Sequence, residues 1–345
     1  MNYGISYMGS KTAIAKDIID ILPSGNRFVD LFGGGFAISH YVLLHHVYNN
    51  QLSLFGKKWS SLLYNDIDFL VVDTIKKAIN GDYNYKVFKP DFIFKKDFDI
   101  LKEKDGYVKT CWSFGNNGKN YMYSDEIVNY KYACHQAIVF DEWEEMQKLC
   151  SEVWEVAYNA IKNIKDIKQR RLKFAPAIVK KLKQLNDWDM VQNNPLYKSC
   201  QWRGGKIDIN RTDNDLQSLQ SLQSLQSLQS LERLQRLQSL ESLESLERLE
   251  RLEITCSSYE NYKYKKGDVI YCDIPYEDTA SYLSSFNHKI FYDWAINQPY
   301  QLFFSSYNNI SDKRFKIIWQ KEKRSSYSAT NNATKNIECI YTNKE

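Results

Sequence analysis

The stretch that most restricts how this chain folds is the run 27–46, in which three consecutive glycines separate an apolar segment from a helical one. The residues RFVDLF (27–32) have the pattern of a short buried strand, GGG (33–35) that of a tight turn, and FAISHYVLLHH (36–46) that of the helix after it. LLYNDID (62–68) has the pattern of a second strand that ends in acidic residues. Strand, turn, helix and strand in this order predict a parallel α/β sheet.

Further segments of the same kind lie at both ends of the chain. Apolar residues recur at mostly helical spacing over 14–22, where Pro23 predicts the end of the helix. Four more strands are expected towards the C-terminus, at 249–255, 266–276, 301–309 and 315–322. We therefore expect one α/β sheet assembled from the first and last parts of the 345-residue chain.

The middle of the chain has a different composition, rich in Tyr, Trp, Asn and Lys, and helical patterns dominate it. A change of this kind inside an α/β pattern is typical of an inserted domain. We expect a discontinuous α/β domain at 1–75 and 245–345, a mainly helical insertion at 76–215, and a low-complexity tract at 216–252.

In the low-complexity tract, leucine occupies every third position from Leu216 to Leu252. In an α-helix a step of three residues turns through about 300°, so successive leucines drift around the surface instead of forming one stripe. A long 3₁₀-helix would align them, but it is rarely stable beyond three or four residues. We expect a helix that is apolar on several sides, or a poorly ordered insertion in a tolerant connection; a partner-binding or oligomerising surface is the alternative.

Composition excludes several classes of protein. No apolar run approaches the roughly 20 residues that span a bilayer, and the N-terminus lacks the order of a signal peptide, so we expect a cytoplasmic protein. The seven cysteines are scattered without a C-x-x-C pair, which indicates reduced thiols and no zinc site. The net charge is only +4, but nine basic residues lie between Lys162 and Lys183. Such a segment suits binding to phosphates, and a solvated helix face is the alternative.

The sequence YCDIPYEDT (271–279) places a carboxylate, a proline and an aromatic ring directly after a strand pattern. The amino group of adenine or cytosine is a poor nucleophile, because its lone pair is delocalised into the ring. Asp273 and a main-chain oxygen just beyond it could accept the two N–H groups and direct the lone pair at a methyl group on a sulfonium cofactor. Pro275 would fix the turn and Tyr276 would stack on the base. The trio predicts a pocket for a flipped base that carries an amino group.

The glycine turn and the end of the second strand predict a ligand site, because open α/β sheets bind ligands at the carboxyl ends of their strands. Glycines let the backbone approach a ligand closely, although a glycine-rich turn alone is weak evidence. Neither common phosphate-loop motif is present. We expect Asp66 to accept hydrogen bonds from the ribose of an adenosine-containing cofactor. Asp68 is the alternative for that role, and a strand-end cap is the alternative for either acid.

Several motifs taken together resemble one family, the Dam-type, class alpha N6-adenine DNA methyltransferases. They are YMGSK (7–11), FVDLFGGGF (28–36), YNDID (64–68), SFGNNGKNY (113–121), GDVIYCDIPYEDT (267–279) and FFSSYNN (303–309), in the family's order. The resemblance implies a Rossmann-like, S-adenosylmethionine-dependent methyltransferase sheet with an inserted helical DNA-recognition domain. It also implies site-specific transfer of a methyl group to the N6 amino group of adenine in DNA, in a bacterial or phage-infected cell.

The resemblance also implies roles for single residues. The cofactor site would be formed by Tyr7, Lys11, Asp30, Phe32, Gly34 and Asp66, with Tyr7 and Lys11 at the methionine part, and the catalytic residues would be Asp273, Pro275 and Tyr276. The cofactor would be S-adenosylmethionine and the partner double-stranded DNA with a flipped adenine. We expect no metal and no membrane, and a monomer or weak dimer.

Contacts to DNA are expected from the insertion. Glycines between aromatic or basic residues predict hairpins in KTCWSFGNNGKNYMYS (109–124) and QWRGGKIDINR (201–211). A base-flipping enzyme must hold phosphates on both sides of its target, so these hairpins and the basic segment are expected to contact DNA. The residues proposed for this role are Asn116, Asn117, Lys119, Arg170, Arg171, Arg203 and Lys206.

Two residues depart from the family pattern. Ile274 takes the place of the first proline of Asp-Pro-Pro-Tyr, and Phe36 stands where the family usually has glycine or another small residue, which could crowd the cofactor. An active adenine methyltransferase remains the favoured interpretation. The alternatives are a catalytically impaired DNA-binding relative and an amino methyltransferase that acts on cytosine or RNA.

Overall fold

The computed structural model describes residues 3–47, 58–185, 194–200, 229–243, 250–277, 286–324 and 335–344. The chain forms two compact units, the first made of Met1–Gly81 and Arg236–Glu345 and the second of Asp82–Gln235. The first boundary lies close to residue 75, where the sequence pattern changes. The second lies inside the helix α13 (Gln229–Gln238), within the leucine tract.

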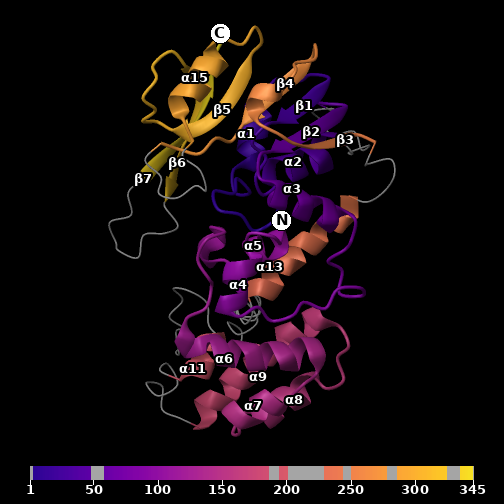
Figure 1. Cartoon of the computed structure of the whole chain (residues 1–345). Coiled ribbons are helices and arrows are strands. Elements are labelled where there is room, and N and C mark those ends of the chain that lie inside the picture. The colour runs from indigo at the N-terminus through magenta and orange to yellow at the C-terminus, as the bar shows by residue number, and fades with distance from the viewer. Residues whose placement is uncertain are drawn as a thin grey trace. The chain divides into compact units, whose positions relative to one another are not determined.

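The first unit is built on a seven-stranded sheet with the strand order β3-β2-β1-β4-β5-β7-β6 (Figure 1). Its first five strands in this order are parallel, while β7 runs antiparallel to both β5 and β6. The mixed α/β fold expected from the sequence is therefore confirmed. The strands are β1 (Arg27–Asp30), β2 (Ser61–Asp66), β3 (Leu252–Cys256), β4 (Asp268–Cys272), β5 (Leu302–Tyr307), β6 (Lys316–Arg324) and β7 (Lys335–Thr342).

The helices predicted at 14–22 and 36–46 are present as α1 (Ala15–Ile21) and α2 (Ala37–Val42), which continues as a π-helix over Leu43–Val47. The structure adds α3 (Phe69–Ile79) and α15 (His288–Ile296), which the sequence analysis did not predict. The last turn of α1 is closed by the Lys58 ammonium, which donates to the carbonyl oxygens of Ile19, Asp20 and Leu22 at 2.7, 3.0 and 3.0 Å. A cation at the C-terminal end of a helix also interacts favourably with the helix dipole.

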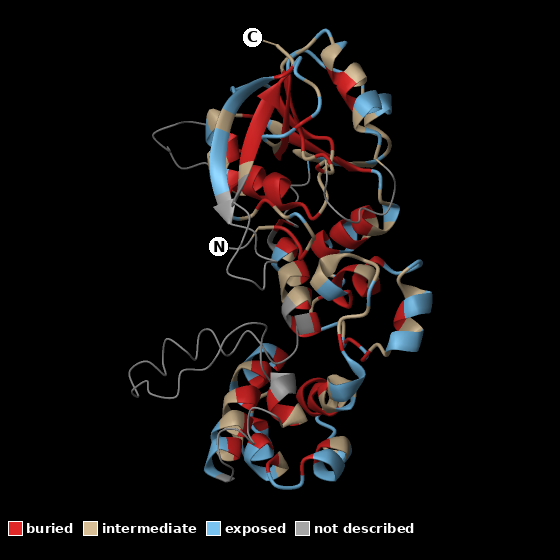
Figure 2. Cartoon of the chain, turned by 90° about the vertical axis from the view of Figure 1, so that its left-hand side faces the viewer, coloured by how far each residue is buried: buried red, intermediate tan, exposed pale blue. Residues whose placement is uncertain are grey.

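The C-terminal pair of strands differs from the expectation, because the pattern indicated β6 but not β7. β7 lies between β5 and β6 and is buried on both faces, whereas β6 is mostly exposed. Figure 2 shows the buried strands in red beside the pale blue edge strand. The exposed lysines Lys316 and Lys321 on β6 discourage pairing with a further strand.

The second unit is helical, as expected. Its helices are α4 (Lys95–Leu101), α5 (Gly106–Cys111), α6 (Asp125–His135), α7 (Glu144–Leu149), α8 (Trp154–Ile161), α9 (Ile167–Leu185) and α11 (Pro195–Cys200). The hairpin expected at 109–124 is wrong in part: the chain leaves α5 and forms a loop closed by one antiparallel bridge between Ser113 and Tyr121. Left-handed residues at Gly115, Asn116 and Gly118 turn the chain too sharply for two regular strands.

The described part of the leucine tract is core rather than a tolerant connection. Leu231, Leu234, Leu237, Leu240 and Leu243 are all at most 1% exposed. The α-helix α13 changes at Ser239–Leu243 into a 3₁₀-helix, where a step of three residues does align the leucines. Apolar packing thus encloses this segment on several sides, and the expectation of a loosely held spacer is wrong for 229–243. The rest of the tract lies outside the described residues.

We predict that Leu234→Ala lowers the free energy of unfolding by about 2 to 5 kcal/mol, because it leaves a cavity in a packed core. The matched control is Ile100→Ala on α4, where the side chain is 60% exposed and the expected change is below about 1 kcal/mol. Urea unfolding followed by circular dichroism measures both. Equal losses for the two variants would contradict a core role for the leucine tract.

Candidate functional site

The glycine turn is packed from both sides by tyrosine rings. A Cβ atom added at Gly33 would lie 2.1 Å from a ring carbon of Tyr64, and one at Gly35 would lie 2.4 Å from Cβ of Tyr7. Gly34 has a φ of +45°, and the Tyr64 hydroxyl donates to its carbonyl oxygen at 2.8 Å. The turn therefore needs glycine for its own packing, and it brings Tyr7 of the YMGSK motif against the backbone.

The Phe36 side chain packs in the core, and its effect on a cofactor stays a prediction. Its backbone is left-handed with a φ of 66°, which explains why glycine suits this position. Its ring is fully buried and lies 5.1 Å from the Tyr64 ring and 6.3 Å from the His40 ring. Burial lowers the pKa of His40 to about 4, so the neutral ring accepts a hydrogen bond from the Gly4 amide at 3.0 Å. Phe36 is thus a core residue, and its ring packs against Tyr64, the residue that also contacts the glycine turn.

Asp30, at the end of β1, is a buried carboxylate with spare acceptor capacity. It is 1% exposed, and its Oδ2 accepts from the Ser39 hydroxyl at 2.7 Å. Among the described residues, its Oδ1 has no hydrogen-bond partner. Burial, and to a smaller extent the charges of Asp273 and Asp66, raise the pKa of Asp30 to about 7. Such a group would gain from a cationic donor placed at Oδ1.

Asp66 and Asp68 separate into two roles. Asp68 caps α3, since its side chain accepts from the amides of Leu70 and Val71 at 3.1 and 3.4 Å. The Asp66 carboxylate accepts from the Gly34 amide at 2.8 Å through Oδ2 and from the Asp68 amide at 2.8 Å through Oδ1. Asp66 therefore ties the glycine turn to the end of β2, and of the two acids it is the one that lies beside the turn.

Asp273 follows β4 directly and is held by residues from two distant parts of the sequence. The Lys11 ammonium lies 2.8 Å from Oδ1, and the Ser305 hydroxyl of β5 donates to the same oxygen at 2.6 Å. Lys11 is 4% exposed, whereas the Asp273 side chain retains 21% exposure. The structure thus places Lys11 on the carboxylate that is predicted to be catalytic, a contact that the sequence did not predict.

The next three residues have distinct environments. Ile274, at the position of the family's first proline, is 1% exposed, and its side chain packs in the apolar core. The Pro275 carbonyl oxygen lies 2.7 Å from Nε2 of His288. Tyr276 is 8% exposed, and its hydroxyl donates to Oε1 of Glu338 on β7. Burial raises the pKa of Tyr276 well above its ordinary value, so the hydroxyl keeps the proton that it donates.

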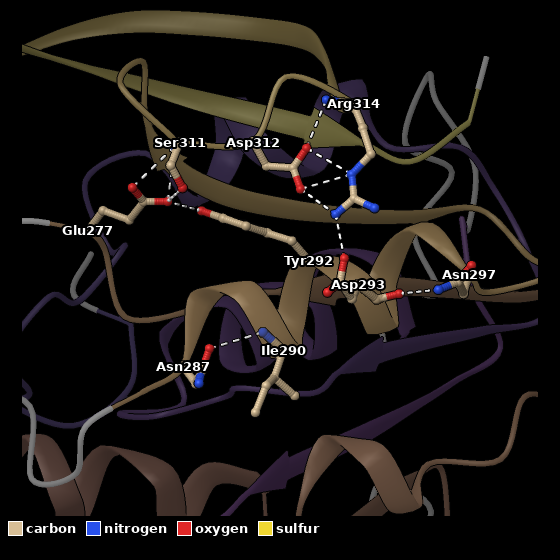
Figure 3. A network of polar contacts seen from close by, with 9 residues as sticks. All are labelled: Glu277, Asn287, Ile290, Tyr292, Asp293, Asn297, Ser311, Asp312 and Arg314. Atoms are coloured by element: carbon tan, nitrogen blue, oxygen red, sulfur yellow. Dashed lines mark hydrogen bonds and ion pairs between the residues drawn. The ribbon is translucent and has the colours of Figure 1, made fainter.

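Glu277 anchors the far end of this segment. Its carboxylate accepts from the Tyr292 hydroxyl at 2.7 Å and from the Ser311 hydroxyl and amide at 2.9 and 3.1 Å (Figure 3). Nearby, Arg314 pairs with Asp312 and with Asp293 of α15. The segment after β4 is therefore fixed at its start by Lys11 and at its end by the loop that follows β5.

Two of the predicted cofactor residues are aromatic. The Tyr7 ring lies against Gly34, with Cε1 only 3.0 Å from where a Cβ would stand. Phe32 packs on Phe286 and Phe291 at ring distances of 5.8 and 5.7 Å and is only partly buried. Contact of either ring with a cofactor stays a prediction.

The structure brings the predicted site residues of the first unit together. The ion pair joins Lys11 to Asp273, and the charges of Asp273 and Asp66 act on Asp30. Sequence reasoning missed Glu338 and gave Ser305 no role. A glutamate inside the apolar run NIECIYT (336–342) was the available signal for the first, because buried glutamates are rare without a partner.

The loop 113–121 of the second unit contains residues predicted to contact DNA. Some of their side chains form hydrogen bonds within the loop itself. The Asn117 side chain accepts from the amides of Lys119 and Asn120 at 2.8 and 3.0 Å. Asn116 is left-handed, and its side-chain oxygen is buried. Asn117 therefore shapes the loop, while contact of these residues with DNA stays a prediction.

The structure argues against DNA contacts by Arg170 and Arg171. Arg170 is 8% exposed and donates to the Ala137 carbonyl and to Asp141, both at 2.6 Å. Arg171 is 1% exposed and donates to Gln235 at 2.9 Å. Guanidinium groups used inside the fold cannot neutralise phosphates, so this prediction is corrected. Arg203 and Lys206 lie outside the described residues.

The comparisons with known proteins agree with the site. The sequence model of the family described as D12 class N6 adenine-specific DNA methyltransferase matches residues 7–79, which include the YMGSK motif, the glycine turn and Asp66. Residues 7–79 are therefore similar to this family of methyltransferases. The match supports an adenine-specific DNA methyltransferase, an activity that the family name places at N6 of adenine in DNA. No curated protein matches the chain.

Two searches of the described residues gave negative findings. No helix there is both long and apolar enough to cross a membrane. No group of three or more His, Cys, Asp and Glu side chains in the same part of the chain is arranged to hold a metal ion.

We predict that the stability of the protein falls as pH rises from about 4 to about 7, because the folded state keeps a proton on Asp30 that the unfolded chain has released. The loss contributed by Asp30 is on the order of 4 kcal/mol and is complete above that window. Asp30→Asn keeps an acceptor for Ser39 and should remove this loss.

Urea unfolding at pH 5 and pH 8 measures the effect. Asp20→Asn is the control, since it makes the same chemical change at an exposed position on α1. Equal pH dependence in Asp30→Asn and wild type would contradict the assignment of the proton to Asp30.

Proposed function

We propose that this protein transfers a methyl group from S-adenosylmethionine to N6 of adenine at specific sites in double-stranded DNA, with the adenine flipped out of the duplex. The observation that carries the proposal is the cluster of Asp273, Asp30 and Asp66 at the carboxyl ends of adjacent parallel strands. Ligands of open α/β sheets bind at this edge. The family match over residues 7–79 supports the same reaction.

The residues around the glycine turn fit S-adenosylmethionine. Methyltransferases of this family generally use that cofactor, which supplies an electrophilic methyl group on a sulfonium. The Oδ1 atom of Asp30 is a buried acceptor suited to the amino group of the methionine part. Asp66 retains acceptor capacity for a ribose hydroxyl. Ile67 beside it is 71% exposed and offers an apolar surface for the adenine ring.

The segment 273–276 would bind the target base. The Asp273 carboxylate would accept one N–H of the adenine amine and the Ile274 carbonyl the other, since the Pro275 carbonyl already lies within hydrogen-bond distance of His288. These bonds localise the nitrogen lone pair and fix its direction. Lys11 and Ser305 both contact Oδ1 of Asp273 in this structure, so an incoming amine that takes this oxygen displaces the ammonium.

Tyr276 would stack on the flipped adenine. In this structure the Lys11 ammonium lies over its ring, 4.6 Å from the centroid, and the Tyr307 ring meets it edge-on at 4.7 Å. The face covered by Lys11 becomes available when Lys11 moves. Displacement of one ammonium would therefore open the carboxylate and the stacking surface together.

The exposed lysines of α9 would neutralise DNA phosphates in place of the two buried arginines. Lys173 and Lys180 are exposed and lie on one face of the helix, because seven residues make nearly two full turns. Lys119 in the loop 113–121 is a further candidate. We propose that the protein acts on DNA as a monomer or weak dimer.

The test of the proposed function is Asp273→Ala. Transfer of a tritiated methyl group to unmethylated duplex DNA should fall by about 100-fold or more, while S-adenosylmethionine still binds, because the carboxylate acts on the base amine. Asp20→Ala on the surface of α1 serves as the control. Nucleoside analysis by mass spectrometry should identify N6-methyladenine as the product. An active Asp273→Ala, or a different methylated nucleoside, would overturn the proposal.

We predict that the double variant Lys173→Gln and Lys180→Gln weakens DNA binding. The slope of log K against log salt concentration is negative, and its magnitude should fall by up to about 2, since each lost phosphate contact removes about 0.9. The control is Lys148→Gln, because Lys148 is exposed on α7 and pairs with Glu144 and Glu145. Fluorescence anisotropy at several salt concentrations measures the slope. An unchanged slope would show that α9 does not contact phosphates.

A further inference from the structure

Glu338 on β7 is a buried carboxylate whose neighbours are site residues. It is 1% exposed and stands directly opposite Tyr307 in the register of β5 and β7. The Tyr276 hydroxyl donates to its Oε1, and the Lys11 ammonium lies 3.7 Å from the same oxygen. A carboxylate is stable in such a place only when charged or polar groups face it. Here the two groups are Lys11 of the YMGSK motif and Tyr276 of the segment 273–276.

Lys11 therefore lies between two carboxylates. Its Nζ is 2.8 Å from Asp273 Oδ1 and 3.7 Å from Glu338 Oε1, and it also donates to the Gly9 carbonyl at 3.1 Å. A small movement of Nζ would reverse the order of the first two distances. A substrate amine that takes Oδ1 of Asp273 replaces Lys11 there, and an ammonium left without a carboxylate in a buried site would oppose that replacement.

We propose that Glu338 is a positioning residue for methyl transfer, which receives the Lys11 ammonium when the adenine amine replaces it on Asp273. Glu338 holds the Tyr276 hydroxyl at the same time, so the stacking ring keeps its orientation while Lys11 moves. The inference rests on the proposed function and adds a residue from the C-terminal antiparallel strands. It also explains why a glutamate occupies a strand that is otherwise part of the core.

The test compares wild type with Glu338→Gln and Glu338→Asp. Glutamine keeps an oxygen that accepts from Tyr276 but removes the charge, whereas aspartate keeps the charge on a shorter side chain. We expect Glu338→Gln to lower kcat for tritiated methyl transfer to duplex DNA by about 10- to 100-fold. The affinities for S-adenosylmethionine by calorimetry and for DNA by anisotropy should stay within about twofold. Glu338→Asp should recover part of the lost kcat.

The matched control is Glu322→Gln on the neighbouring strand β6, where the glutamate is exposed and kcat should not change. A wild-type kcat in Glu338→Gln would overturn the inference, because the hydroxyl bond alone would then suffice. A parallel loss of kcat and both affinities would also overturn it, since it would indicate a general structural role.

Two further outcomes are distinguishable. A wild-type protein that binds S-adenosylmethionine and DNA without transferring a methyl group would overturn the proposed function and this inference with it. If Glu338→Gln does not fold, as judged by its unfolding transition, Glu338→Asp decides. A reduced kcat with unchanged affinities supports the role, and an unchanged kcat or a parallel loss of affinity overturns it.

Discussion

The ion pair between Lys11 and Asp273 is the interaction on which the arrangement of the site depends. It joins the segment before the first helix to the residue after β4, at a separation of 2.8 Å. Lys11 is almost fully buried, so its charge is only weakly screened and an unpaired ammonium at this place would be unfavourable. The N-terminal motif is thereby held over the edge of the sheet where β1, β2 and β4 end.

Several carboxyl groups surround the Lys11 ammonium. Asp30, Asp66, Asp273 and Glu338 all lie in the same part of the first unit, and burial together with mutual repulsion raises the pKa of Asp30 to about 7. Carboxyl groups this close together repel one another, and a cationic ligand placed among them would offset the repulsion. S-Adenosylmethionine, with a sulfonium and an amino group, is such a ligand.

The antiparallel strands β6 and β7 contribute to the chemistry as well as closing the sheet. β7 places Glu338 opposite Tyr307, and β5 places Ser305 on Asp273. Residues i and i+2 of a strand face the same side, so Ser305 and Tyr307 act on the same segment. The strands that follow the proposed catalytic segment in the sequence thus hold it in place. Glu277 fixes the C-terminal end of the segment by accepting a hydrogen bond from the Ser311 hydroxyl.

Much of the first unit followed from the sequence alone. The run from β1 through the glycine turn to β2 has periodic apolar residues and local turn signals, which determine structure over short distances. The order of the motifs then indicated the resemblance to a methyltransferase family. Tertiary structure decided what depends on long-range packing. It buried Arg170 and Arg171 inside the helical unit, enclosed the leucines of α13 and brought Glu338 to Tyr276. Sequence shows which side chains are charged, but only the folded chain determines which of them face solvent and which face one another.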